Sequence, residues 1–255
     1  MAFKKTIVSG ICGIALALVA NGTVQANNLV VNGGFETTTN GPGQLGFNTD
    51  ATGWSVPDGG YTFLFASGGA DGPGATGQYG NLQLWGPQNG SANGLPANSP
   101  DGGNYIAQDP AFQLQPIQQT ISGLTSGNVY DVSFYWGGAQ QENFTGATWE
   151  GWQVSLGAES HTTPGDGLNS PGTISNLNHG FTGWQHTTLE FTATSSSEVL
   201  SFLALGGPTG VPPFAVLDGV SMQAVPEPSS LALAALGLTA LGVIRMRRRV
   251  KSDSV

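Results

Sequence analysis

Short segments in which apolar and polar residues alternate recur between residues 27 and 224. Apolar side chains occupy the even positions of 130–136 and of 152–156, and residues such as Asp131 and Gln153 stand between them. Alternation with period two is typical of strands that bury one face. Further runs of this kind are 189–191, 199–205 and 214–222. Turn clusters such as 57–60 and 101–104 separate the runs, and no helical period is found.

Many short strands joined by glycine turns predict an all-β fold. An antiparallel β-sandwich of the jelly-roll type is the expected architecture for residues 27–224, and two small independent domains are the alternative. The stretch 66–103 is rich in Gly, Asn and Pro and is expected to form long loops on one edge of the sandwich, where such folds often carry function.

Charge is distributed very unevenly along the chain. Every Lys and Arg lies before residue 6 or after residue 244, whereas 14 of the 16 acidic residues lie within 27–224. A body without cations repels phosphate, which excludes nucleic-acid binding. It also excludes sites that need an arginine clamp or a catalytic lysine.

The first 26 residues have the order of a secretory signal peptide. Lys4 and Lys5 precede an apolar run from Ile7 to Ala20, and small residues precede Asn27, so cleavage is expected after Ala26. A retained anchor helix is the alternative. The only cysteine, Cys12, lies inside this segment, so the mature chain needs no disulfide.

Residues 225–255 contain a second targeting segment. A Pro-Glu-Pro triplet precedes an apolar run at 231–244 and a basic tail; the residues that define it are Pro226, Glu227, Pro228, Arg245, Arg247, Arg248 and Arg249. The segment resembles the PEP-CTERM sorting signal of Gram-negative bacteria. That resemblance implies a short transmembrane helix, an exosortase-type processing protease, and delivery to the cell envelope or extracellular matrix. A plain single-span tail anchor is the alternative.

Four segments of the body carry a second resemblance. They are NLVVNGGFE at 28–36, GW at 53–54, the run 117–136, and FAVLDGVSM at 214–222. Together they resemble the galactose-binding-like jelly roll of carbohydrate-binding modules. The resemblance implies that Glu36 and Asp218 share a structural calcium ion, for which carboxylate oxygens are suitable ligands. The alternative is that both side chains cap turns.

Aromatic residues are the candidate ligand contacts, because sugars present apolar faces that stack on rings and neutral polysaccharide needs no cation. Trp54, Trp136 and Trp152 are expected in the core. Trp85 and Trp149 stand beside turns and are the best exposed candidates. Tyr79, Tyr105 and Gln140 are secondary candidates.

A secreted glycoside hydrolase is a further alternative. Glu142, Glu150 and Glu159 follow one another in sequence and are expected on a solvated acidic face rather than as a catalytic pair. The three histidines show no metal-binding spacing. The sequence thus predicts a non-catalytic, exported protein that binds extracellular polysaccharide, with a structural matrix protein lacking a discrete ligand as the main alternative.

Overall fold

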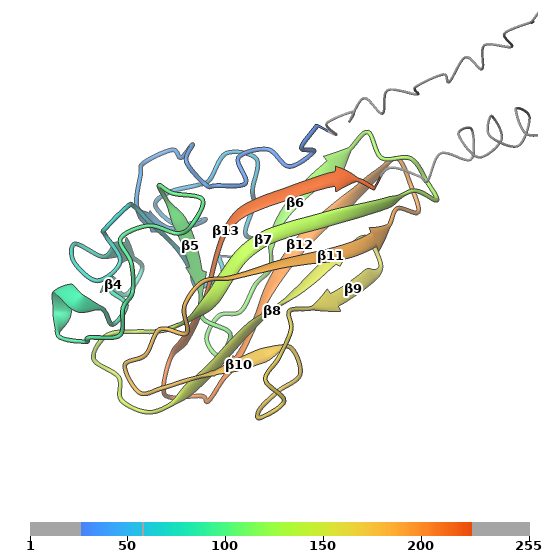
Figure 1. The fold of residues 1–255 in the computed structure, drawn as a ribbon. Helices are drawn as coiled ribbons and strands as arrows, with labels where there is room; N and C mark the ends of the chain where they lie inside the picture. Colours follow the sequence, from blue (N-terminus) through green and yellow to red (C-terminus); the bar gives the residue numbers. More distant parts are fainter. Residues whose placement is uncertain (1–26, 58, 226–255) are drawn as a thin grey trace, which may run out of the picture.

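The computed structural model describes residues 27–57 and 59–225, which form two antiparallel sheets packed face to face (Figure 1). The first sheet contains, in spatial order, β1 (Gly43–Gln44), β2 (Thr62–Phe65), β5 (Tyr105–Gln108), β13 (Pro213–Ala224), β7 (Val129–Gln140) and β11 (Gln185–Thr192). The second contains β10 (Thr173–Asn176), β8 (Thr148–Leu156), β12 (Ser197–Gly207) and β6 (Ile117–Ser122), and β9 (Glu159–Thr162) pairs with β8.

The order of the strands is that of a jelly roll. Eight strands from β5 to β13, with β9 left out, make up the roll. Counted along the chain, the first, eighth, third and sixth lie side by side in one sheet, and the second, seventh, fourth and fifth in the other. In this double Greek-key order, successive strands of the roll lie in opposite sheets, except that the fourth and fifth, β8 and β10, pair with each other. The expected all-β jelly-roll sandwich is confirmed.

The main core lies between the two sheets and contains the side chains that the alternation placed inward. Trp136 and Trp152 are 1% and 0% exposed, and Trp54 is 7% exposed, as expected. Their buried N–H groups are satisfied: Trp136 Nε1 donates to Thr187 Oγ1 at 2.8 Å, and Trp152 Nε1 donates to the Val216 carbonyl at 3.0 Å.

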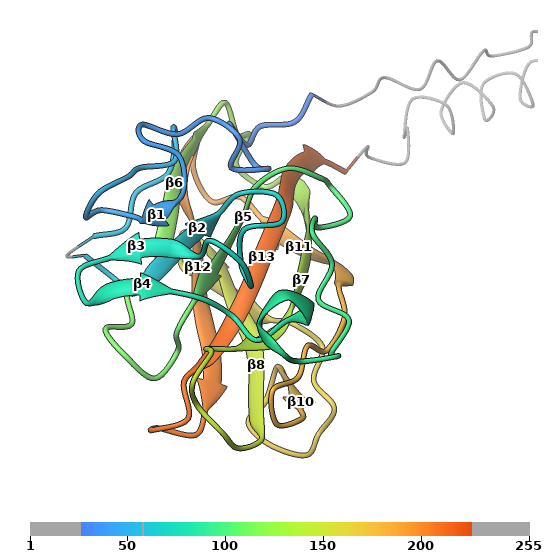
Figure 2. The ribbon, with the colours of Figure 1, turned by 90° about the vertical axis from the view of Figure 1, so that its left-hand side faces the viewer.

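Residues 66–104 lie over the outer face of the first sheet instead of forming loops along an edge. The segment contains β3 (Ala75–Gly77), β4 (Gly80–Leu82) and a short 3₁₀ turn, η1 (Pro87–Asn89) (Figure 2). Its buried residues, such as Leu84, pack with Phe63, Phe65 and Phe214 into a second hydrophobic cluster. These sheet residues alternate with those of the main core, so this part of the sheet is buried on both faces.

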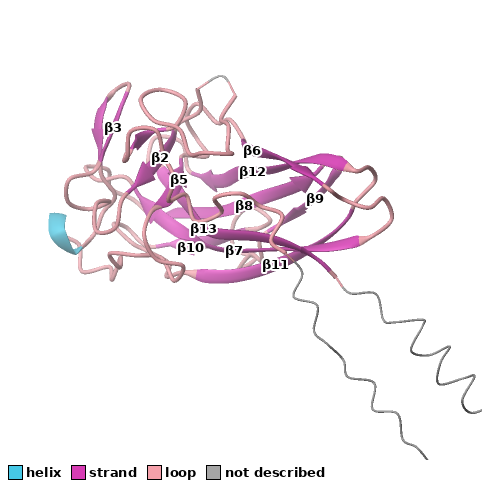
Figure 3. Ribbon diagram, turned by 90° about the horizontal axis from the view of Figure 1, so that it is seen from above, coloured by secondary structure: helices cyan, strands magenta, loops and turns pink. Residues whose placement is uncertain are grey.

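The first and last described residues lie close together at one end of the sandwich. The Leu29 amide donates to the Met222 carbonyl and the Val225 amide to the Val129 carbonyl, each at 2.9 Å. The η1 turn lies far from these residues (Figure 3). β13 is 12 residues long, so its two ends are separated by about 36 Å.

Candidate functional site

Glu36 and Asp218, the expected calcium ligands, lie beside a third carboxylate, Asp101. A Cβ atom on Gly34 would lie 2.8 Å from Asp101 Oδ2 and 3.8 Å from Asp218 Oδ1. The Asn104 amide donates to Glu36 Oε1 at 2.7 Å. The N-terminal segment, the turn before β5 and strand β13 therefore meet at this cluster.

The turn before β5 approaches Glu36 so closely that it requires a glycine. Gly103 has φ +61°, and a Cβ atom there would collide with Glu36 Oε1. Both the left-handed conformation and the close approach exclude a larger residue. The turn that carries Asp101 is thus shaped around the Glu36 carboxylate.

Asp218 is the buried member of the cluster. It is 0% exposed, and burial raises the pKa of its carboxyl group to about 8; the Ser99 hydroxyl and Gly219 amide oppose this rise, whereas Asp101 and Glu36 add to it. Ser99 Oγ donates to Asp218 Oδ2, and Asp218 Oδ1 has no hydrogen-bond partner. Because residues 27–224 contain no Lys or Arg, no cationic side chain is present to neutralise the group.

The carboxylate oxygens of Glu36, Asp101 and Asp218 are suitable ligands for a hard cation but do not make up a complete coordination shell. An unpartnered buried carboxylate oxygen with two further carboxylates nearby is the donor type that calcium prefers. In the part of the chain that the structure describes, however, no three His, Cys, Asp or Glu side chains are grouped closely enough to hold a metal by themselves. Backbone carbonyl or water oxygens would have to complete the shell.

The two tryptophans that were the best candidates for ligand contact are half-buried and packed against protein. Trp85 stacks on the His179 ring, with centroids 4.0 Å apart, and its Nε1 donates to the Phe144 carbonyl at 2.9 Å. Trp149 lies on the outer face of β8, close to Gly207. Trp85 therefore holds the loop between β7 and β8.

Two secondary candidates are buried and cannot lie on a binding surface. Tyr105 is 1% exposed and packs edge-on against Trp184, because the segment 66–104 covers its side of the sheet; burial raises the pKa of its phenol. Gln140 is 0% exposed and joins two loops by accepting from the His179 amide at 2.7 Å and donating to the Gly146 carbonyl at 3.0 Å. Of the five predicted ligand contacts, Tyr79 is the one that is well exposed, at 64%.

The three glutamates of the hydrolase alternative do not form one site. Glu150 is fully buried between the sheets, which corrects the expectation of a solvated face. In the β8–β9 hairpin Glu159 lies opposite Leu156. Leu156 is six residues after Glu150 along β8, so Glu159 and Glu150 are about 20 Å apart. The pKa of Glu159 is lowered by the hydrogen bonds from the Thr192 amide and His161. A glutamate so stabilised as a carboxylate is a poor general acid.

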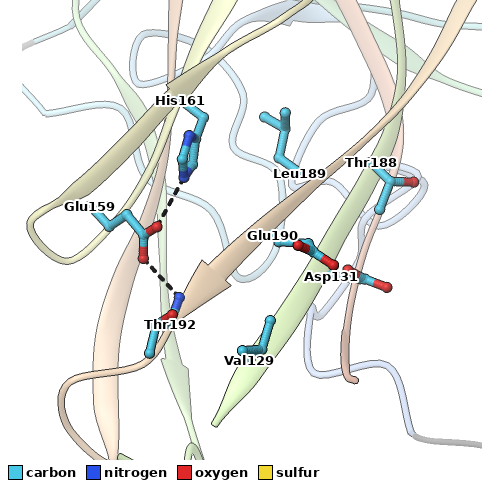
Figure 4. Close-up of a pocket in the computed structure, with 8 residues that line it drawn as sticks. All are labelled: Val129, Asp131, Glu159, His161, Thr188, Leu189, Glu190 and Thr192. Carbon is cyan, nitrogen blue, oxygen red and sulfur yellow. Dashed lines mark hydrogen bonds and ion pairs between the residues drawn. The ribbon is translucent and has the colours of Figure 1, made fainter. Parts of the chain in front are cut away.

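Glu159 lines an open groove of about 720 Å³ between strands β9 and β11 (Figure 4). Its Oε1 lies 3.0 Å from His161 Nε2, and the Thr192 amide donates to Oε2 at 2.7 Å. Glu190 of β11 and Asp131 of β7 also line the groove and lie directly opposite each other in the paired strands. Two negative charges therefore face each other there. No polar group of the groove is buried without a partner, and nothing in it selects a ligand.

The sequence did not single out Asp101 and Ser99, which lie beside Asp218, or Phe112 and Phe144, which line a groove together with Tyr79. All four lie in turns, and their partners are distant along the chain. The available signal was weak: an aromatic or acidic residue within a Gly-, Pro- or Asn-rich turn.

Residues 224–249 match the PEP-CTERM protein-sorting motif. The expected sorting residues 226–249 and the signal peptide with its cleavage site after Ala26 lie outside the described residues. No helix in the described part of the chain is long and apolar enough to cross a membrane. The chain is thus a jelly-roll protein with a C-terminal sorting motif, which indicates an exported protein.

Comparison with solved structures finds low similarity to carbohydrate-binding modules. The TmCBM61 module in complex with β-1,4-galactotriose has 15% identity and a TM-score of 0.37, with 78% of this chain and 100% of that chain covered. The CBM22-1 xylan-binding domain of Xyn10C from Paenibacillus barcinonensis has 12% identity and a TM-score of 0.36, with coverages of 78% and 96%.

An adhesin domain gives a similar result. The K1 cleaved adhesin domain of Lys-gingipain from Porphyromonas gingivalis W83 has 11% identity and a TM-score of 0.36, with coverages of 76% and 96%. No curated protein matches the chain. At such low similarity the function has to be argued from the residues of this chain.

Proposed function

We propose that the exported protein is a non-catalytic module that binds uncharged extracellular polysaccharide at the envelope or in the matrix of a Gram-negative bacterium. The observation that carries the proposal is that three exposed aromatic side chains, Tyr79, Phe112 and Phe144, line one groove on a body without Lys or Arg. Aromatic faces bind sugar rings without any cation, whereas the 14 carboxylates of residues 27–224 oppose polyanions.

Delivery to the surface follows from the two ends of the chain. The signal peptide directs export, and an exosortase-type protease processes the C-terminal segment, which anchors the protein in the membrane until then. The basic tail after residue 244 keeps that end cytoplasmic, by the positive-inside rule. β13 ends at Ala224, so the triplet at 226–228 follows the body almost directly.

Calcium has a structural role in this proposal. Glu36, Asp101 and Asp218 would hold the ion with backbone or water oxygens. An ion there would neutralise a buried carboxylate that has no cationic neighbour and would fasten the N-terminal segment to the last strand.

A glycan-array screen of the full chain tests the proposal. The protein is kept in a polyoxyethylene detergent, because sugar-based detergents would compete, and is screened once with millimolar calcium and once with EDTA. Saturable binding to neutral glycans is expected. A folded protein that binds no glycan in either buffer contradicts the proposal and favours the structural matrix protein.

A further inference from the structure

An aromatic groove opens where four loops meet, at the end of the sandwich opposite the chain termini. It has a volume of about 410 Å³ and is lined by Tyr61, Tyr79, Asp109, Phe112, Phe144 and the loop between β12 and β13. Tyr79 comes from the β3–β4 turn, Phe112 from the loop after β5, and Phe144 from the loop between β7 and β8.

The aromatic residues of the groove are exposed to an unusual degree. Tyr79, Phe112 and Phe144 are 64%, 44% and 36% exposed. Eight large hydrophobic side chains are exposed in the described residues, and three of them line this groove. Scattered exposed hydrophobic residues need no explanation, but a cluster of rings in one concave surface marks a binding site.

The rings are held in place by one another. Tyr61, which is buried, packs edge-on beneath Phe112 with centroids 5.0 Å apart and an interplanar angle of 90°. Phe112 meets Tyr79 at 5.7 Å, and Gln113 Nε2 donates to the Tyr79 hydroxyl at 3.0 Å. Fixed rings lose little conformational entropy when a ligand stacks on them.

The loop that carries Phe144 is also fixed. Trp85 Nε1 donates to the Phe144 carbonyl, and His179 covers one face of the Trp85 ring. Gln140, at the end of β7, donates to the Gly146 carbonyl in the same loop. Three buried or half-buried side chains therefore position an exposed ring from behind, so Trp85 is a positioning residue.

The polar lining of the groove includes Asp109, Gln141 and Thr209, and Asp109 is the one charged side chain among the lining residues. Asp109 is 2% exposed, and its Oδ1 accepts from the Ala111 amide at 2.7 Å. A carboxylate this deeply buried offers almost no surface to a ligand, but its negative charge repels phosphate, sulfate and uronate. No basic residue lies anywhere in 27–224 to offset this.

From this geometry we propose that the groove is the ligand subsite of the protein and takes a sugar ring of a neutral polysaccharide, stacked on Tyr79 and Phe112. The assignment rests on the proposed function and gives it a place in the fold. The groove lies at the end of β7 and β13 away from Val225, about 36 Å along β13 from the chain end. A protein held at its C-terminus therefore presents this subsite outward.

Affinity electrophoresis tests the assignment. The full chain in a polyoxyethylene detergent migrates through native gels that contain galactan, xylan or amylose, or alginate as a polyanionic control. We expect retardation in at least one neutral gel and none in alginate. Tyr79→Ala and Phe112→Ala should each weaken affinity at least tenfold, because each removes a stacking face.

Two controls separate the outcomes. Phe47→Ala removes a ring whose exposure, 57%, lies between those of Tyr79 and Phe112 and which does not line the groove, so it should leave the retardation unchanged. Equal retardation of the wild type and both groove variants overturns the subsite but leaves the proposed function standing. No retardation of the wild type in any neutral gel overturns both.

A second copy of the chain is the competing occupant of an exposed apolar groove. Sedimentation velocity of the wild type and of Tyr79→Ala distinguishes it. We expect monomers in both cases. A wild-type dimer that Tyr79→Ala dissociates would overturn the subsite and make the groove an interface.

Discussion

Glu150 is a carboxyl group that the fold encloses without a cation. It lies on the inward face of β8, where Gly138 of β7 makes room for it, since a Cβ atom on Gly138 would collide with Glu150 Oε2. Burial raises the pKa of Glu150 well above its usual value; Thr148 and Asn176 oppose this rise, although neither makes a hydrogen bond of normal geometry to the carboxyl oxygens. Burial in the folded protein thus favours the neutral form of this group.

We predict that Glu150→Gln stabilises the protein at neutral pH and not at acid pH. The folded pKa lies above the unfolded one, so the stability that the neutral acid contributes is complete below pH 4.5 and falls as the pH rises through the folded pKa. The loss amounts to about 1.4 kcal/mol per pH unit between the two pKa values, and glutamine avoids it. Thermal melts of both proteins at pH 4 and pH 7 measure the difference. Equal shifts at both pH values would contradict the prediction.

Asp218 leads to a prediction of the opposite kind, because a metal ion would favour its charged form. Millimolar calcium is expected to raise the melting temperature above that in EDTA, by about 2–4 °C for each kcal/mol of binding free energy. Asp218→Asn should abolish the calcium effect. Asp131→Asn, a change of the same type in β7, should retain it. A wild type that melts at one temperature in both buffers rules out a calcium site.

At the scale of elements, the segment 66–104 decides which sheet residues are accessible. Its strands and turns bury Phe63, Phe65 and Tyr105 on the outer face of the first sheet. The same segment contributes Tyr79 to the groove and Trp85 to the support of the Phe144 loop. It is therefore both a structural cover and one wall of the proposed subsite.

Leu84→Ala tests whether this cover is part of the cooperative fold. Leu84 is 0% exposed in the second hydrophobic cluster, so its truncation should lower the free energy of unfolding by about 2–5 kcal/mol. Val199→Ala, at a position that is 40% exposed, should change it by no more than about 0.5 kcal/mol. Chemical denaturation followed by Trp fluorescence measures both. A loss below 1 kcal/mol for Leu84→Ala would show that the cover unfolds separately.

For the whole molecule, charge defines what the body can bind. Residues 27–224 have 14 carboxylates and no Lys or Arg, so their formal charge is −14 with His neutral. In the described part of the chain the one ion pair joins His161 and Glu159. Electrostatic attraction can thus not drive binding of a polyanion, and stacking and hydrogen bonding remain.

We predict that binding to a neutral polysaccharide depends little on salt. Because no charged ligand group is neutralised, affinity should change less than about twofold between 50 and 500 mM NaCl. Isothermal titration at both salt concentrations, in the presence of calcium, is the measurement. A loss of tenfold or more at high salt would indicate an ionic ligand and contradict a neutral one.

The sequence by itself determined the class of fold, the C-terminal sorting motif and the absence of cations from the body, and the signal peptide stays a prediction. Period-two alternation depends on residues two apart, so it places Trp136 and Trp152 inward before any tertiary contact is known. The same alternation locates strands but does not show which turns lie close to one another in the folded chain. Glu36 and Asp218 were found because their motifs resemble those of a known family. The turn 101–104 was recognised only as a turn, so Asp101 was not found.

Only the tertiary structure decided which turns meet. Tyr105 and Gln140 are buried because segments from elsewhere in the chain cover them. Glu150 is buried, whereas the acidic residues before and after it along the chain, Glu142 and Glu159, are partly exposed. The aromatic groove joins residues between 61 and 212, in loops that strand pairing brings together at one end. Burial and proximity of this kind are set by contacts between distant residues, and a local pattern carries no information about them.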